Sequence, residues 1–484
     1  MRRILIVLIA GLLGCAIMRE ARAGEGRDLT PEERAFIENT LSYFSLAHEH
    51  SGNLWPAYDL STIPIIFHDH EASSGFLFNG PEKLPPGFAL LDEFPSVAFR
   101  AEGVVYNQGF ELGIPIGGVV GAAIGISESY GLVAHEVFHH YQSSKSFHKG
   151  GASDNNLPQP ANLALAQLEQ RCLAQALRCD ERKRLLEPVR DFLRARSRRH
   201  SGLDSRIVEL EHTLEAREGT AEYVQRLTSA AILGKLPHPV AEAKESGDVL
   251  EGLAAKLEQR LSVESYRTLR YYQTGFAIGL LLDRFEMAEW KKRVETGATL
   301  TDLLRDASGF GDEDLAPQND LTQSAEFQVL LRDAETTIAS ERNRLQERAD
   351  AFHRSRGVKT VLRLEGRLKK EAFMSKAEDL AWVEPGKALF GKGSKISLNR
   401  EQAFVEVYDE LLMEWKGGAV CCTFYVTDPR IEVDGQDVDV ETERGAGQEV
   451  DRRGKLVLNS SKCAIRAADG RVSTDKEGLQ LVLY

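Results

Sequence analysis

The sequence has no excess of positive charge. Its 60 lysines and arginines stand against 73 aspartates and glutamates, a formal net charge of −13 at pH 7. Nucleic-acid binding depends on clustered Lys and Arg that neutralise phosphates, so this balance argues against a nucleic-acid partner. One basic run does occur at 194–199. Because it is short and lies in a helix-forming region, it is interpreted as a solvated helix face.

Cysteine is scarce, and the spacing of the six cysteines does not match a zinc ribbon. After the N-terminal segment five cysteines remain, an odd number. Cys172 and Cys179 lie seven apart in a helical run, which would hold them about 10 Å apart. That is too far for a disulfide unless the helix breaks. Cys463 with Cys421 or Cys422 is the more favoured bridge, and the sequence leaves the choice open.

Long apolar runs are missing beyond the N-terminal segment. The most apolar later stretch, 114–126, is rich in glycine and too short to span a bilayer. At the N-terminus, two arginines precede the apolar stretch 4–18, a pattern typical of a secretory signal peptide. The sequence therefore predicts export, to the periplasm or the exterior.

Two processing sites compete within this segment. Ala21-Arg22-Ala23 fits a signal peptidase site, which gives a signal peptide at 1–23. Leu12-Leu13-Gly14-Cys15 instead resembles a bacterial lipobox, in which a lipidated Cys15 would anchor the protein to a membrane. Cleavage after Ala23 is slightly favoured, and no other membrane attachment is predicted.

The chain of 484 residues is longer than one hydrophobic core usually serves, so several domains are expected. Residues 24–130 mix helical and β-type runs, whereas 131–310 repeat apolar residues at intervals of three and four, as helices do. Residues 311–356 read as a connecting helix, and 357–484 as a β-rich domain with Gly-rich turns. The predicted fold class is therefore α+β.

The segment His135-Glu136-Val137-Phe138-His139 carries the clearest chemistry. On a helix, His135 and His139 project from one face and can bind one Zn²⁺, while Glu136 stands beside the metal as a general base. The residues around them are apolar, as a buried metal-binding helix requires. The sequence predicts zinc as the cofactor.

A catalytic zinc usually has three protein ligands, and Glu218 is the candidate for the third. Gly219 and Ala221 beside it are small enough to let two helices approach closely around a metal. Glu222, one turn further on, is a candidate to accept a hydrogen bond from a ligating imidazole. The alternative for both glutamates is an ordinary solvated helix carboxylate.

The HEVFH segment followed by Glu-Gly-x-Ala-x-Tyr at 218–223 resembles the gluzincin metallopeptidases. That resemblance implies a zinc held by His, His and Glu, and a peptide or protein substrate. In the aminopeptidase N-like branch a Tyr-x-x-Gly helix supplies a tyrosine that stabilises the oxyanion, and Tyr272 to Gly275 matches this pattern. Tyr271 is an alternative for that role, and a core tyrosine is another.

The sequence departs from that family in two respects. His139 and Glu218 are so far apart that a helical insertion, about 149–207, must lie between them. Membrane-bound prenyl-protein proteases have a comparable gap and a Glu-x-x-Ala-Asp element similar to 218–222, but this chain lacks their membrane spans. The Gly-x-Met-Glu-Asn element that grips a substrate N-terminus is also missing, so aminopeptidase activity is not expected.

Taken together, these patterns predict an exported zinc-dependent metallohydrolase, most simply a peptidase. Glu136 and Tyr272 are the candidate catalytic residues. Two alternatives remain: a zinc hydrolase that acts on a non-peptide substrate, and a non-catalytic envelope or binding protein that keeps the fold.

Overall fold

A computed structural model of the protein describes two compact units. We call them the helical unit, the described residues within Leu12–Asp154 and Pro158–Thr337, and the strand unit, those within Ile338–Tyr484. The described residues are 54–58, 65–69, 74–78, 90–91, 100–101, 104–105, 126–151, 157–232, 247–315, 321–354, 358–364, 373–376, 381–384, 387–391, 395–399, 403–408, 411–416, 419–426, 429–438, 451–460, 463–475 and 478–483. The predicted α+β class is confirmed.

The predicted signal peptide at 1–23 and Cys15 lie outside the described residues. Within the part of the chain that the structure describes, no helix is both long and apolar enough to cross a membrane.

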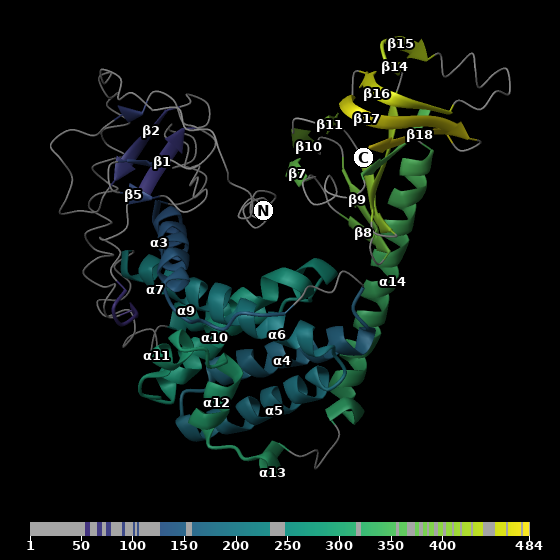
Figure 1. Ribbon diagram of the computed structural model, residues 1–484. Coiled ribbons are helices and arrows are strands. Elements are labelled where there is room, and N and C mark those ends of the chain that lie inside the picture. The colour runs from purple at the N-terminus through teal and green to yellow at the C-terminus, as the bar shows by residue number, and fades with distance from the viewer. Residues whose placement is uncertain are drawn as a thin grey trace. The chain divides into compact units, whose positions relative to one another are not determined.

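Helices dominate from residue 126 to residue 354 (Figure 1). They are α3 (Ile126–Ser143), α4 (Pro160–Arg178), α5 (Arg182–His200), α6 (Ser205–Leu214), α7 (Thr220–Ile232), α9 (Gly247–Leu257), α10 (Arg270–Arg284), α11 (Trp290–Glu295), α12 (Leu300–Ser308), α13 (Asp312–Leu315) and α14 (Ala325–His353). Two π turns, η3 (Glu215–Gly219) and η4 (Ser265–Leu269), lead into α7 and α10, and η5 (Leu321–Gln323) is a 3₁₀ turn.

Close backbone contacts join α3 to α7, and α10 to the turn η3 that leads into α7. A Cβ on Gly131 of α3 would lie 3.0 Å from the carbonyl oxygen of Gln225 on α7, so these two helices pack closely at this point. A Cβ on Gly275 of α10 would lie 2.6 Å from the Cα of Gly219 in η3. Only glycine fits such a backbone-to-backbone approach. Gly219 thus allows the close helix approach expected of it.

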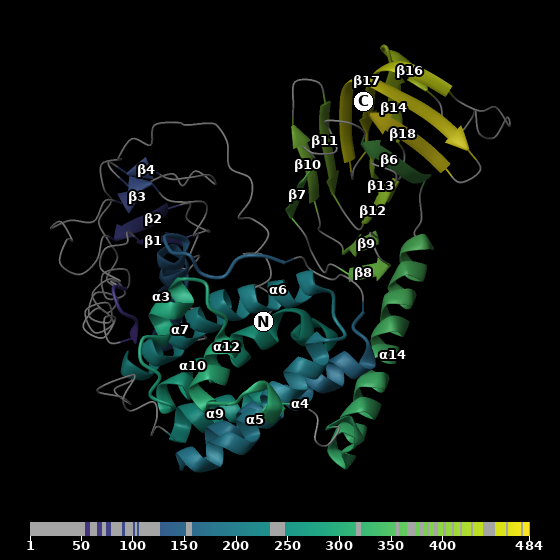
Figure 2. The ribbon, with the colours of Figure 1, turned by 60° about the horizontal axis from the view of Figure 1, so that its bottom comes forward.

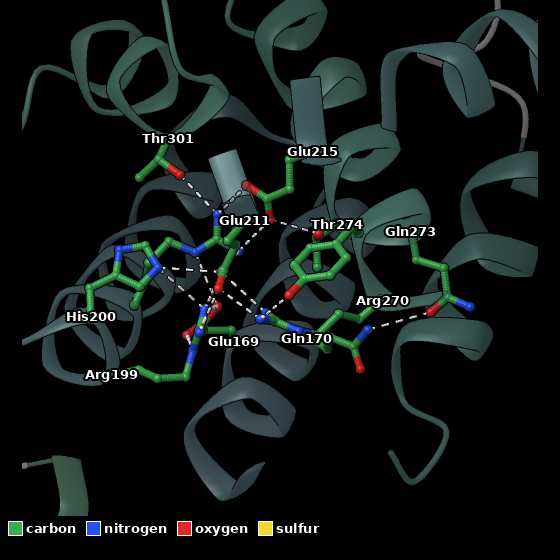
Figure 3. A network of polar contacts seen from close by, with 12 residues as sticks. Glu169, Gln170, Arg199, His200, Glu211, Glu215, Arg270, Gln273, Thr274 and Thr301 are labelled. Atoms are coloured by element: carbon green, nitrogen blue, oxygen red, sulfur yellow. Dashed lines mark hydrogen bonds and ion pairs between the residues drawn. The ribbon is translucent and has the colours of Figure 1, made fainter. Parts of the chain in front are cut away.

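The prediction of a solvated face for the basic run 194–199 is wrong for two of its arginines. Arg196 is 1% exposed and Arg199 is fully buried, and both donate to buried carboxylates. Figure 3 shows the contacts of Arg199. They belong to a set of three buried arginines and three buried glutamates, which we call the ion-pair network. Its members are Glu169, Arg196, Arg199, Glu211, Glu215 and Arg270. The basic run by itself does not indicate these ion pairs, because each arginine's partner lies on another turn or helix.

The N-terminal strands are short. The strands β1 (Ile65–Asp69), β2 (Ser74–Phe78) and β3 (Leu90–Leu91) form one antiparallel sheet, and β4 (Arg100–Ala101) pairs with β5 (Val104–Val105).

The strand unit is built on one 13-stranded sheet (Figure 2). Its strands are β6 (Val358–Leu364), β7 (Phe373–Lys376), β8 (Ala381–Glu384), β9 (Lys387–Phe390), β10 (Lys395–Asn399), β11 (Ala403–Tyr408), β12 (Leu411–Lys416), β13 (Ala419–Val426), β14 (Arg430–Val433), β15 (Gln436–Val438), β16 (Asp451–Asn459), β17 (Cys463–Asp475) and β18 (Gly478–Leu483). The main path runs β15-β14-β16-β17-β18-β6-β13-β12-β9-β8, and β11 pairs with β17 and β10, and β10 with β7. Only the β18–β6 pair among the described ladders is parallel.

Alternating side chains on these strands form an apolar core. Leu362 on β6 lies opposite Cys422 on β13, and Leu364 opposite Val420, and all four are buried. The period of two follows from the pleat of a strand. At the β14–β15 hairpin, Gly435 has φ 78°, a left-handed conformation that favours glycine.

The favoured disulfide between Cys463 and Cys421 or Cys422 is wrong. Among the described residues, none of the five cysteines forms a disulfide. Cys463 begins β17 and the cysteine pair lies on β13, and the strand order places β18 and β6 between these two strands. Neighbouring strands are about 4.8 Å apart, whereas a disulfide requires Cα atoms within about 7 Å.

Candidate metal centre

The two histidines of the HEVFH segment lie on α3, as predicted. His135 and His139 are one helical turn apart, and their ring centroids are 4.7 Å apart. The intervening Phe138 is fully buried against Trp55 and Tyr58, with ring centroids 5.0 and 5.2 Å away. These aromatic contacts pack α3 directly beside its two histidines.

Glu218 reaches the same place from η3. This π turn joins α6 to α7 and takes up an extra residue compared with an α-helical turn, a distortion common at functional sites. Glu218 is 5% exposed. On the same turn, the carboxylate of Glu215 accepts two 2.7 Å hydrogen bonds from Arg196 of the ion-pair network. It also accepts one of 2.8 Å from Thr274, as Figure 3 shows. The turn is thus anchored beside Glu218.

The three candidate ligands converge. His139 Nε2 lies 3.2 Å and His135 Nε2 3.5 Å from Glu218 Oε2. One ligand atom from each residue lies within 4.8 Å of the others, so the group can hold a metal ion. Donors about 2.0–2.1 Å from a tetrahedral zinc lie about 3.3 Å from one another, and the two separations from Glu218 Oε2 agree with this value.

The charge state of Glu218 suits a cation site. Burial favours its neutral form and raises its pKa, yet the neighbouring His139 and His135 outweigh burial and hold the pKa well below its usual range. The carboxylate is therefore ionised at neutral pH. A buried carboxylate that faces two imidazole nitrogens is a donor set for a divalent ion.

Gln142, which the sequence did not suggest, contacts His139. Its Oε1 lies 2.7 Å from His139 Nδ1, and its Nε2 donates to the carbonyl oxygen of Arg217 at 2.9 Å. The imidazole contact expected of Glu222 is thus made by Gln142. The carboxylate of Glu222 accepts a 2.6 Å hydrogen bond from Arg226 on the same helix. A glutamine three residues after the second histidine of HEVFH is the only sequence signal for this contact.

Of the two tyrosines at the start of α10, Tyr272 lies at the site. Its ring is nearly parallel to that of His135, at 13° and with centroids 5.8 Å apart. Tyr271 instead accepts a hydrogen bond from Arg270 at 3.2 Å, and burial raises its pKa to about 12. The geometry therefore favours Tyr272 over Tyr271 for the role expected of one of them.

Glu136 follows His135 on α3, but its side chain lies outside the described residues. Its role as a general base stays a prediction.

No known protein family, curated protein or solved structure matches this chain. The grouping of His135, His139 and Glu218 stands on its geometry, which supports metal binding.

Proposed function

We propose that the protein is an exported zinc-dependent metallohydrolase that cleaves peptide bonds. The observation that carries the proposal is the convergence of His135, His139 and Glu218 at separations of 3.2 and 3.5 Å. Two imidazoles and one carboxylate are the donor set of many catalytic zinc sites, whereas Ca²⁺ and Mg²⁺ prefer oxygen ligands. The donor chemistry thus favours zinc.

In the proposed mechanism, the metal ion and two side chains each have a separate role in hydrolysis. A bound Zn²⁺ would polarise the scissile carbonyl and lower the pKa of a water molecule toward about 7. Glu136 would remove the proton from the attacking water and deliver it to the leaving amine. Tyr272 would donate a hydrogen bond to the oxygen that gains negative charge. Peptide as the substrate rests on the resemblance of the motifs to gluzincins, and export rests on the segment 1–23.

Metal analysis and peptide hydrolysis of three proteins test this function. The wild-type protein should hold one zinc and cleave peptides. Glu136→Gln should keep the zinc and lose the hydrolysis, because it removes a proton acceptor and no ligand. Glu218→Ala should lose the zinc, because only two of the three protein ligands that a catalytic zinc usually has would remain.

The matched control is Glu222→Gln, which changes a carboxylate four residues from Glu218 that is bonded to Arg226. It should keep both zinc and activity. Wild-type protein without stoichiometric zinc would contradict the proposal. Zinc-loaded protein that hydrolyses esters or glycans but no peptide would leave the metal centre in place and refute peptide as the substrate.

A further inference from the structure

Gln142 connects the two halves of the candidate metal centre. It lies on α3, one turn after His139, and is 3% exposed. Its amide touches the imidazole of His139 on one side and the π turn η3, which carries Glu218, on the other. A buried amide in this position must have its polar atoms matched to its neighbours, because an unpaired buried donor or acceptor destabilises the fold.

The neighbours decide which way the amide faces. Its Nε2 lies 2.9 Å from the carbonyl oxygen of Arg217, 3.4 Å from that of Ala216 and 2.8 Å from Thr220 Oγ1. Carbonyl oxygens only accept, and the Thr220 hydroxyl already donates to Ala216 at 2.6 Å. All three oxygens therefore require the NH₂ group on this side, which turns Oε1 toward His139.

The orientation of the amide fixes the tautomer of His139. Oε1 of Gln142 only accepts, so the 2.7 Å contact requires a hydrogen on His139 Nδ1. A neutral imidazole carries one ring hydrogen, so Nε2 then presents its lone pair. That lone pair faces Glu218 Oε2 at 3.2 Å. Two acceptors at this distance repel each other unless a cation lies between them, either a metal ion or the second proton of a charged imidazole.

We propose that Gln142 is a positioning residue that fixes the metal-binding tautomer of His139 and ties this ring to the turn that carries Glu218. A divalent cation then meets two ligands that are already aligned. The inference rests on the metal centre of the proposed function but does not depend on peptide hydrolysis.

The other histidine lacks such a contact. His135 is 4% exposed, and its Nδ1 has no hydrogen-bond partner among the described residues. Gln142 therefore provides the orienting hydrogen bond for one of two imidazoles, and its loss should weaken metal binding measurably. Mutation of groups that orient metal ligands typically lowers metal affinity by about 10–100-fold.

The test compares the zinc affinity of the wild type and Gln142→Met by competition with a chromophoric chelator. Methionine keeps the length of the side chain and removes both polar contacts. We expect zinc affinity to fall by about 10–100-fold. Nitrogen NMR of the zinc-free protein at about pH 8.5, where an ordinary imidazole is neutral, should show hydrogen on Nδ1 of His139 in the wild type. A mixture of tautomers is expected in the variant.

Two further variants make the result specific. Glu222→Gln should keep wild-type zinc affinity, since its partner is Arg226. If Gln142→Met does not fold, Thr220→Val, which removes one of the oxygens that orient the amide, should still weaken zinc binding and mix the tautomers.

Wild-type zinc affinity in Gln142→Met, an equal loss in Glu222→Gln, or hydrogen on Nε2 of His139 in the zinc-free wild type would each overturn the inference. Wild-type protein that binds zinc tightly but cleaves no peptide would refute the proposed function and leave this inference intact. A wild type that binds no zinc would overturn both.

Discussion

The helical unit and the strand unit bury different chemistry. The helical unit encloses the ion-pair network, whose six charged side chains are each at most 2% exposed. In the strand unit, the buried side chains of the described residues are apolar or cysteine except for Thr360. Its ion pairs, such as Arg453–Asp469 and Arg471–Asp451, lie on the surface.

This contrast follows from what each unit has to hold. Apolar packing stabilises without direction, so the sheet needs only side chains of the right size and alternation. Buried charges require particular partners and distances. The network fixes the relative positions of α4, α5, α6, η3 and α10, and η3 and α10 carry Glu218 and Tyr272. We infer that the polar interior positions the site.

Among the substitutions that test this difference between the units, Glu211→Gln should have the largest effect on stability. Glu211 accepts hydrogen bonds from Arg199 and from Arg270, with 2.8 Å to Arg199 Nη1 and 2.7 Å to Arg270 Nη2. The variant leaves buried arginine charge uncompensated, which should lower the free energy of unfolding of the helical unit by about 3–5 kcal/mol. Denaturant unfolding measures it. Glu251→Gln, at an exposed carboxylate bonded to Arg178, should change little, and equal effects of the two variants would refute the distinction.

In the strand unit, the corresponding change is apolar. Leu458 on β16 is fully buried in the sheet core, so Leu458→Ala should cost about 2–5 kcal/mol in unfolding free energy. Zinc affinity should stay at the wild-type value, because all three candidate ligands belong to the helical unit. Asn459→Ala, at the exposed neighbouring position, is the control. A loss of zinc binding in Leu458→Ala would show that the units are not separate in function.

Zinc should stabilise one unit only. A ligand that binds the folded state at about 100 times its Kd adds about 2.7 kcal/mol of stability. Calorimetry with added zinc should therefore raise the melting temperature of the helical unit and leave that of the strand unit unchanged. Glu218→Ala should abolish the shift, and a shift in the strand unit would contradict the assignment of the site.

Lowering the pH to 4.5 should produce the smallest of these effects, a slight loss of stability in the helical unit. Burial raises the pKa of Glu211, but Arg199 and Arg270 outweigh it and hold the pKa well below 4.5, and the pKa of Glu169 is lowered by Arg199 and Arg196 against the same effect of burial. The unfolded chain therefore takes up protons first as the pH falls. Stability that is present above pH 4.5 is lost as the pH falls through the folded-state pKa values.

At pH 4.5 this loss should amount to about 0.4 kcal/mol per carboxylate, because the unfolded carboxyl is then half protonated. Urea unfolding between neutral pH and pH 4.5 should show the decline in the helical unit. If the strand unit declined more steeply, the buried carboxylates would not be its cause.

The sequence could predict those parts of the site that depend on local spacing. His135 and His139 share a helix face by their interval of four, and the small Gly219 marked Glu218 as a residue near a helix crossing. The fold class likewise followed from the change from helical to strand periodicity. These inferences needed no knowledge of which helices meet.

The remaining features depend on tertiary contacts. Gln142 carries no motif, and its role follows from three oxygens on η3 and α7, 74 to 78 residues away. The burial of Arg196 and Arg199 could not be read from a basic run, since their partners lie on other turns of the fold. Spacing rules describe one helix at a time, and these contacts arise where several helices pack.

The backbone contact between Gly219 and Gly275 fixes the distance between η3 and α10 at the candidate site. Each glycine lies within three residues of a functional candidate, Glu218 on one side and Tyr272 on the other. Their separation is thus determined by two backbones that touch and not by side chains that can change rotamer. A single methyl group added at Gly275 would have to force these backbones apart, so it should change the position of Tyr272 relative to His135 without altering any of the three candidate ligands.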